Sequence, residues 1–301
     1  MVHKLSSDHY IFSFAKENKP ALQINSGDEV EFETMDCFAN QICTKEDKLG
    51  TLDWERVNPA TGPVYVNGAE AGDVLKITIK EIQIGDQGVV ATGKDLGVLG
   101  HLMEDLYAKV LPIKDGQVIF NSKIAIPLNP MVGVIGVAPA GEGISCGTPG
   151  AHGGNMDTKL IAENAVLYLP VFVDGAFFAL GDLHAAMGDG EIGVSGVEVA
   201  GKVRVKLEVV KGKKTKNPLV QTPEVTATIA SASTLDEAAQ IAVEEMANLL
   251  QRTTPLSIAE IATLMSAVGN LQVSQVVDPL KTVRFSIPNP ILASYGVKLG
   301  S

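Results

Sequence analysis

The segment that decides the fold class is Asp73–Ile82, DVLKITIKEI, which alternates apolar and polar residues along its whole length. A period of two is typical of a β-strand that has one face in the core and one face near solvent. Val30–Phe32 and Val203–Val209 repeat the alternation, each after a turn that begins with glycine. Thirty glycines and fifteen prolines in 301 residues also favour many short strands joined by turns. We therefore expect a mainly β protein of packed sheets, of the β-sandwich or jelly-roll type.

The pattern becomes helical near Thr234. Thr234–Glu237 (TLDE) and Ser257–Glu260 (SIAE) each have the spacing of a capping box, in which the hydroxyl and the carboxylate accept hydrogen bonds from the first amides of a helix. Apolar residues then recur every three or four positions, as on the buried face of a helix. Pro255 separates the two segments. The sequence therefore predicts a C-terminal pair of helices.

Two further strands are expected after the helices, at Leu271–Val277 and Thr282–Ile287. This gives an α+β chain with two regions. Residues 1–233 form a β-rich region that carries the active-site motifs. Residues 234–301 form the helical pair followed by two strands, packed on the same domain.

Composition and charge exclude several classes of partner. The net charge is −11, from 24 basic and 35 acidic residues, so the basic surface that nucleic acid requires is missing. Met1–Lys4 lacks the layout of a signal peptide, and no apolar stretch approaches the roughly 18 residues of a membrane span. Three cysteines, an odd number without metal-knuckle spacing, suit a reducing compartment. We expect a cytoplasmic protein with no nucleic-acid or membrane partner.

The densest cluster of potential metal ligands is Gly181–Glu191, GDLHAAMGDGE. Asp182 and His184 are two residues apart, so they share a face if the preceding strand continues, and Asp189 and Glu191 have the same spacing. Imidazole and carboxylates are ligands of zinc and other divalent ions. The alternative is an acidic turn with a structural role only.

A second cluster, His152–Asp157 (HGGNMD), ends the long aperiodic segment Val137–Asn155. Paired glycines beside polar side chains are typical of a site for a small polar ligand, although a tight capping turn has the same composition. Gly147–Gly150 precedes this cluster and is a candidate oxyanion hole. Asp36, at the end of the strand Val30–Thr34, is either a further metal ligand or the cap of a loop.

The motifs together resemble the acetamidase/formamidase family. The strong match covers about residues 133–201, and a weaker one begins at Asn67. It is carried by the following segments: VIGVAP at Val134–Pro139, HGGNMDTKL at His152–Leu160, LPV at Leu169–Val171, GDLH at Gly181–His184, GDGE at Gly188–Glu191 and GVEVAG at Gly196–Gly201.

The resemblance implies hydrolysis of a short aliphatic amide, acetamide or formamide, by a metal-dependent enzyme that assembles as a homo-oligomer. The implied ion is zinc, with calcium or another divalent ion as the alternative. The implied roles are as follows: metal ligands Asp182, His184 and Asp189; catalytic residues Glu191, His152 and Asn155; substrate-binding residues Gly153, Gly154 and Asp157. Asp36 is added as a metal ligand because of its place at the end of a strand, not because of the resemblance. Glu191 would move the proton from water to the leaving nitrogen. Met187 is a departure, because many relatives carry Gln there.

Three alternatives stay open at this stage. Cys146 lies six residues before His152, so a cysteine-nucleophile amidase is one of them. A β-rich protein that binds a metal or a small ligand without turnover is another, because a fold carries no chemistry by itself. The third is a metal-dependent amidase that acts on a lactam or another cyclic amide.

Overall fold

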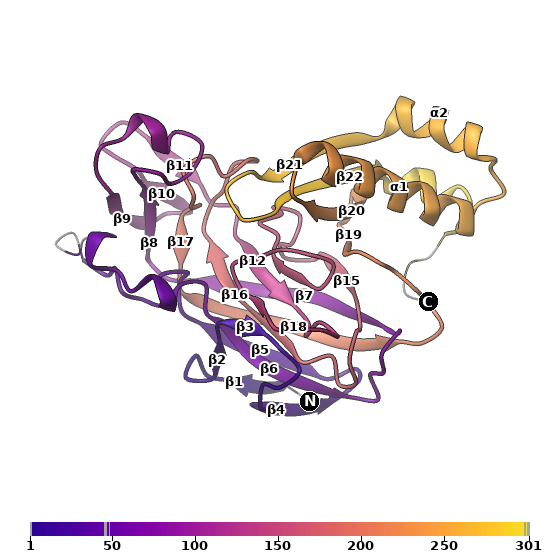
Figure 1. Ribbon diagram of the computed structural model, residues 1–301, viewed down its shortest axis with the longest axis horizontal. Helices are drawn as coiled ribbons and strands as arrows, with labels where there is room; N and C mark the ends of the chain where they lie inside the picture. Colours follow the sequence, from indigo (N-terminus) through magenta and orange to yellow (C-terminus); the bar gives the residue numbers. More distant parts are fainter. Residues whose placement is uncertain (1, 45–46, 48, 298, 300–301) are drawn as a thin grey trace.

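A computed structural model describes residues 2–44, 47, 49–297 and 299 of the chain. Within them, nine strands form one sheet (Figure 1), in the spatial order β1 (Val2–Leu5), β5 (Glu29–Thr34), β18 (Gly201–Val210), β7 (Val74–Ile84), β15 (Val166–Pro170), β19 (Leu219–Gln221), β20 (Val225–Ala232), β22 (Lys281–Pro288) and β21 (Asn270–Gln275). The alternating segments of the sequence are its centre, where Val205 pairs with Ile79 and Leu207 with Ile77. These four side chains are fully buried, which confirms the prediction from period two.

A second sheet has the order β11 (Ala125–Pro127), β10 (Gln117–Ile119), β9 (Tyr107–Lys114), β8 (Gln87–Thr92), β17 (Glu198–Val199), β16 (Phe178–His184), β12 (Met131–Gly136) and β14 (Gly153–Asn155). Three strands branch from it: β6 (Ala60–Asn67) beside β16, and β2 (Tyr10–Ile11) and β4 (Leu22–Asn25) beside β6. Small elements complete the β-rich part: the pair β3 (Ser13–Phe14) and β13 (Ile144–Ser145), and the single 3-10 turns η1 (Leu49–Thr51), η2 (Trp54–Arg56) and η3 (Gly100–Leu102).

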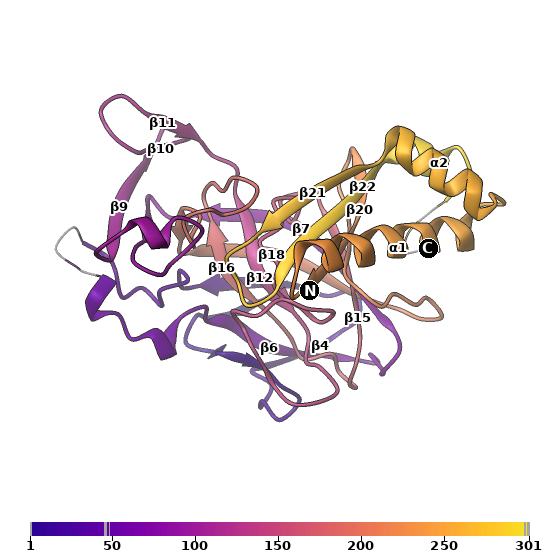
Figure 2. The same ribbon diagram turned by 45° about the horizontal axis from the view of Figure 1, so that its top comes forward.

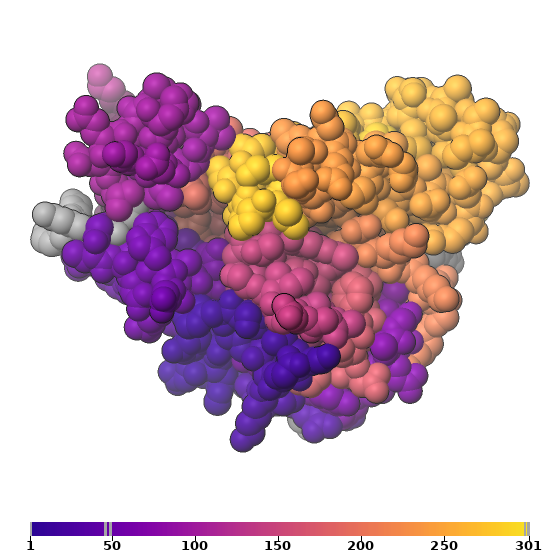
Figure 3. Space-filling view, in the orientation of Figure 1, coloured from indigo at the N-terminus to yellow at the C-terminus, as the bar shows by residue number. Residues whose placement is uncertain are grey.

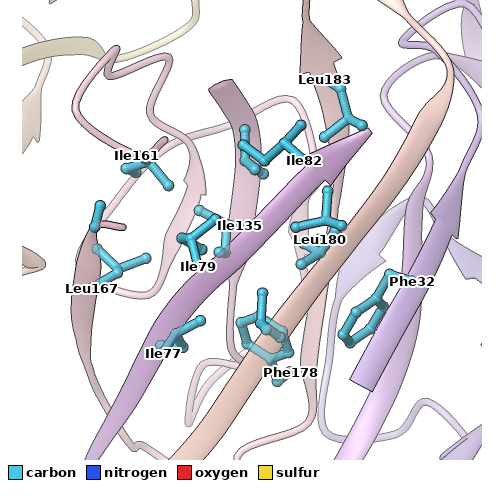
Figure 4. Packing of buried hydrophobic residues seen from close by; sticks show 14 of the residues in the cluster. Phe32, Ile77, Ile79, Ile82, Ile135, Ile161, Leu167, Phe178, Leu180 and Leu183 are labelled. Carbon is cyan, nitrogen blue, oxygen red and sulfur yellow. The ribbon is translucent and has the colours of Figure 1, made fainter. Parts of the chain in front are cut away.

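The main hydrophobic core lies between the two sheets (Figure 4). Phe32 and Ile77 come from the first sheet and Phe178 and Leu180 from the second, and the rings of Phe32 and Phe178 meet edge to face with centroids 5.7 Å apart. Burying each such side chain contributes about 1.5–3 kcal/mol. β16 is buried at every residue, so it does not alternate in sequence, and it carries Asp182 and His184 into the interior.

The C-terminal helices have the predicted places. α1 (Leu235–Thr253) lies against β20 and β22, and α2 (Ile258–Val268) follows it (Figure 1). Ser257 and Glu260 form the complete capping box. The box predicted at Thr234 is only half present: its hydroxyl accepts the Glu237 amide, but the Glu237 carboxylate accepts from the Ser233 hydroxyl instead. A short helix α3 (Asn289–Ala293) follows β22 and was not expected. No helix in the described ranges is both long and apolar enough to cross a membrane.

The hairpin β21–β22 holds the loop that joins β16 to β17. The backbone of Gly190 in that loop donates to Ser274 O (2.8 Å) and accepts from Val276 N (3.2 Å). Arg284 on β22 is 1% exposed, and its guanidinium donates to Asp189 Oδ2 at 2.7 Å and to Ser274 Oγ at 3.2 Å. The hairpin extends beyond the helices (Figure 2), and its tip fills the surface between the β8–β11 lobe and α1 (Figure 3). The C-terminal region therefore fixes a loop of the β-rich region.

Asp189→Ala should destabilise the metal-free protein by about 3 kcal/mol, because the buried Arg284 guanidinium would lose its counter-ion. Lys159→Ala is the matched control: Lys159 Nζ lies 3.3 Å from the same carboxylate, but the lysine is partly exposed, so a loss below about 1 kcal/mol is expected. Urea unfolding of the two variants measures the difference. Equal losses would show that Arg284 does not depend on Asp189.

Candidate active site

The site is built around the imidazole of His184, the last residue of β16. Its Nε2 atom lies near one oxygen of each of four carboxylates: Glu198 Oε2 (3.2 Å), Asp182 Oδ1 (3.4 Å), Asp157 Oδ1 (3.7 Å) and Glu191 Oε1 (3.9 Å). His184 pairs directly with Glu198 of β17, which explains the shortest of these distances. All five side chains are buried. The structure thus brings together Asp157, Asp182, His184 and Glu191 from the two sequence clusters.

Three of these carboxylates stand on unusual backbone. Asp157, Asp182 and Glu191 have φ angles of 43°, 53° and 49°, in the left-handed region that few residues other than glycine adopt and that asparagine, aspartate and histidine adopt more often than the rest. Such backbone costs on the order of 1–3 kcal/mol per residue and persists only where surrounding structure imposes it. Holding these acids in place therefore lowers the free energy of unfolding of the protein.

Two glycines make room for the cluster. A Cβ atom on Gly133 of β12 would lie 2.4 Å from Asp157 Oδ1 and 2.7 Å from Asp182 Oδ2. A Cβ atom on Gly196 would lie 2.6 Å from His184 Nδ1. All three contacts are shorter than van der Waals separation, so any larger residue would displace the carboxylates or the imidazole.

Several atoms of the cluster lack a hydrogen-bond partner within the described part of the chain: both Asp157 oxygens, Asp182 Oδ1, Glu198 Oε2 and His184 Nδ1. Buried polar atoms without partners are rare in proteins and costly. Burial raises the pKa of Asp157 to about 6 and that of Glu198 to about 8. Burial and the adjacent Asp157 raise the pKa of Glu191 well above its usual range. Such a cluster needs protons or a cation to balance its charge.

The donor set fits a divalent cation. Oxygen and imidazole nitrogen are ligands of zinc and of harder ions such as calcium. Two groups of three residues have ligand atoms within 4.8 Å of one another: Asp157, His184 and Glu191, and Cys37, Asp182 and Glu198. Each group contains oxygens that lack a hydrogen-bond partner. These buried atoms destabilise the fold when no cation is bound, and they would coordinate one that is.

Asp36, predicted as a ligand, lies in neither group. Its Oδ1 accepts the Asn40 amide at 2.7 Å, and Asn40 Oδ1 accepts the Asp36 amide at 3.1 Å, so it caps the loop after β5. The carboxyl is still buried, and this burial raises its pKa to about 6. Its neighbour Cys37 is the residue that reaches Asp182 and Glu198.

Asp189, also predicted as a metal ligand, belongs to neither group of ligand atoms. Its carboxylate is bound by Arg284 and faces Lys159, and its side chain is 32% exposed, unlike the buried acids around His184. Asp189 and Glu191 have different surroundings because the chain turns at Gly190 and Glu191 between them. Asp189 therefore anchors the loop, and only Glu191 of this pair reaches the cluster.

The second sequence cluster, His152–Asp157, contributes largely to the packing of β14 against β12. A Cβ on Gly153 would lie 2.2 Å from Ile135 O, so the glycines allow β14 to approach β12 closely. His152 packs its ring edge against Phe14, and burial lowers its pKa to about 4. Asn155 interacts with Asp278, a carboxyl on the β21–β22 loop that also adjoins Asp157. Asn155 therefore lies at the border of the acidic cluster.

The candidate oxyanion hole is wrong in its donors. The amides of Gly147, Thr148 and Gly150 donate to Ser145 Oγ, Ser145 O and Gly153 O, so they are engaged within their own loop. Cys146 does not have the environment of a nucleophile either. It is fully buried, its thiol donates to Ile11 O, and burial raises its pKa well above the usual value.

Sequence reasoning missed Glu198, Cys37 and Asp278. Glu198 lies in the segment GVEVAG, which was noted as a motif without a role for its acid. Cys37 adjoins Asp36, the residue that was chosen. Asp278 comes from a hairpin loop about 80 residues beyond the other acids, and the sequence shows no signal that brings it there.

Comparison with known proteins adds independent findings. The profile of the acetamidase/formamidase family matches residues 13–145 and 140–293. The crystal structure of a predicted acetamidase/formamidase from Thermoanaerobacter tengcongensis is similar, with 66% identity, a TM-score of 0.98 and coverage of 99% of each chain. Acetamidase from Bacillus halodurans shows 50% identity and a TM-score of 0.96, over 98% of this chain and all of that one.

The similarity to curated proteins is lower. Formamidase of Methylophilus methylotrophus is 27% identical over 268 residues, which are 68% of this chain and 66% of that protein. The chain spans less than two thirds of the length of the curated formamidases that it matches.

Gly133→Ala should weaken binding of zinc about 10- to 100-fold, because the new methyl group would push the Asp157 and Asp182 carboxylates apart. Gly141→Ala is the control: its added Cβ would meet no atom within 4 Å, so affinity should not change. Competition with a chromophoric chelator measures both. Unchanged affinity in Gly133→Ala would contradict the placement of the cation between these acids.

The low pKa of His152 predicts acid sensitivity. The unfolded chain takes up this proton near pH 6.5 and the folded chain only near pH 4, so the stability that neutral His152 contributes is full above 6.5 and is lost as the pH falls toward 4. The loss should be on the order of 3 kcal/mol. Urea unfolding of metal-free wild type and His152→Gln from pH 7 to pH 4 tests this. Parallel pH dependences would contradict it.

Proposed function

Because this chain belongs to the acetamidase/formamidase family, we propose that it hydrolyses short aliphatic amides, acetamide or formamide, with a divalent ion held in the cluster around His184. The observation that carries the proposal is the buried imidazole with four carboxylates, several of whose oxygens have no hydrogen-bond partner in the described residues. Zinc is the ion that the imidazole favours.

The reaction adds water to the amide and yields a carboxylate and ammonia. It is slow without catalysis because an amide carbonyl is a poor electrophile and neutral water is a poor nucleophile. A bound divalent ion supplies polarisation of the carbonyl and a more acidic water. Asp157, Asp182, His184 and Glu198 would hold the ion, and the backbone of β16 and β17 fixes the directions of the last three.

Glu191 is the proposed proton shuttle. Its carboxylate is the one farthest from His184 Nε2, at 3.9 Å, and burial beside Asp157 raises its pKa well above the usual range. A carboxyl with a raised pKa accepts a proton from water readily and then donates it to the departing nitrogen. The loop that carries Glu191 is held by Arg284 through Asp189, so the shuttle has a fixed position.

Asn155 and His152 are proposed to border the substrate. The Asn155 Oδ1 atom is buried without a partner in the described chain, so it can accept a hydrogen bond from the amide NH2 group. His152 is neutral at physiological pH because burial lowers its pKa to about 4. Gly153 and Gly154, between these two residues, have no side chains and allow the backbone there to lie close to Ile135 and Thr148. Homo-oligomeric assembly stays a prediction of the family resemblance.

The first test is ammonia release from formamide, acetamide and propionamide, before and after chelation and after addition of zinc. Chelation should abolish release and zinc should restore it. Activity that persists in protein verified to be free of metal would overturn the metal-dependent mechanism, and no release from any of the three would overturn the proposed substrates.

Glu191→Gln should lower kcat by roughly 10²- to 10⁴-fold, the range that general acid–base catalysis supplies, because the amide cannot carry the proton. Glu142→Gln, on an exposed loop, is the control and should keep wild-type activity. Zinc content measured on each variant separates a lost shuttle from a lost ion. A Glu191→Gln enzyme with near-normal kcat would assign the shuttle to another residue.

A further inference from the structure

The buried site holds more carboxyl groups than one divalent ion needs as ligands. Six carboxyl groups lie there, each near enough to at least one of the others to interact with it electrostatically: Asp36, Asp157, Asp182, Glu191, Glu198 and Asp278. Among the described residues, no lysine or arginine lies within ion-pair distance of any of them, and His184 is the only basic partner. Uncompensated charge in a protein interior is strongly unfavourable. When these carboxyl groups are ionised, one divalent ion leaves part of their charge unbalanced, so a second cation would be favoured.

A second set of potential ligands in the cluster includes a residue from the first sheet region, Cys37. Cys37, which follows β5 of the first sheet, has its sulfur within 4.8 Å of ligand oxygens of Asp182 and Glu198. The three side chains are buried, with exposures of 7%, 2% and 1%. Asp182 Oδ1 and Glu198 Oε2 are among the atoms without a hydrogen-bond partner in the described residues. This is a second, independent indication beside the cysteine that the position takes a ligand.

We infer that the site holds two divalent ions, and that the second is bound by Cys37, Asp182 and Glu198. The inference rests on the proposed metal dependence and adds a second ion beside the first, with Asp182 and Glu198 contributing to both. A thiolate selects softer ions such as zinc or cobalt over magnesium and calcium. On binding, the Cys37 thiol loses its proton to solvent and the sulfur forms the bond to the ion. The second ion would also join the two sheets, because β5 belongs to one and β16 and β17 to the other.

Cobalt provides a readout that does not depend on activity. Metal-free wild-type protein titrated with Co²⁺ should bind two ions per chain, and one of them should produce the near-ultraviolet charge-transfer band of a cobalt–thiolate bond. Cys37→Ser should lose that band and bind one ion. Cys43→Ser is the matched control, because Cys43 is exposed and outside the group, and it should keep both the band and the stoichiometry.

X-ray absorption of the zinc-loaded wild type tests the same bond without a variant, in case Cys37→Ser does not fold. One of the two zinc ions would have a thiolate ligand, so the spectrum should show on average half a sulfur per zinc, at about 2.3 Å. A spectrum with no sulfur, a single bound cobalt without the band, or a band that survives in Cys37→Ser would each overturn the inference. Chelator-sensitive hydrolysis with only one ion would leave the proposed function intact, whereas hydrolysis in metal-free protein would overturn the function and leave the binding position standing.

Discussion

The rest of the structure depends on one constraint, the burial of several carboxylates around a single imidazole. Water cannot stabilise these charges, so the protein must hold them where protons or cations can. The distances of 3.2–3.9 Å from His184 Nε2 to four acids are close enough for shared ligation. The left-handed backbone at Asp157, Asp182 and Glu191 would be a defect in an ordinary strand or loop. Here it is the geometry that points the acids at a common centre.

The two sheets and the C-terminal hairpin make that geometry rigid. β16 and β17 set the spacing of His184 and Glu198 by direct pairing, and Leu180 and Leu183 of β16 pack into the core behind it. The loop with Glu191 is not part of a sheet, and it is held instead by backbone bonds to Ser274 and Val276 and by Arg284 through Asp189. The helical pair therefore matters to the site indirectly, because α1 packs on the strand that carries Arg284.

Patterns that repeat along the chain were predictable from the sequence, whereas meetings between distant segments were not. The alternation of apolar and polar residues predicted β7 and β18, and the capping box with helical spacing of apolar residues predicted α2. Both patterns arise from local backbone geometry. The family motifs located Asp182, His184 and Glu191. The contact of Asp189 with Arg284, which lies 95 residues further along the chain, could not be predicted from the sequence. Asp278 and Cys37 reach the cluster from other segments, and only the fold brings them there.

Glycine shows most clearly what one sequence conceals. The abundance of glycine was interpreted as a sign of turns, and many glycines do lie in turns. Gly133 instead lies within a buried strand, where a methyl group would overlap two carboxylates, and Gly196 lies against the imidazole. The sequence does not distinguish a glycine that makes room for a neighbouring side chain from one that permits a turn. Only the turn glycine is accompanied by a local sequence pattern. The residues that shape a close-packed polar site are thus the ones that periodicity and propensity cannot reveal, because their selection depends on atoms that are distant in the chain.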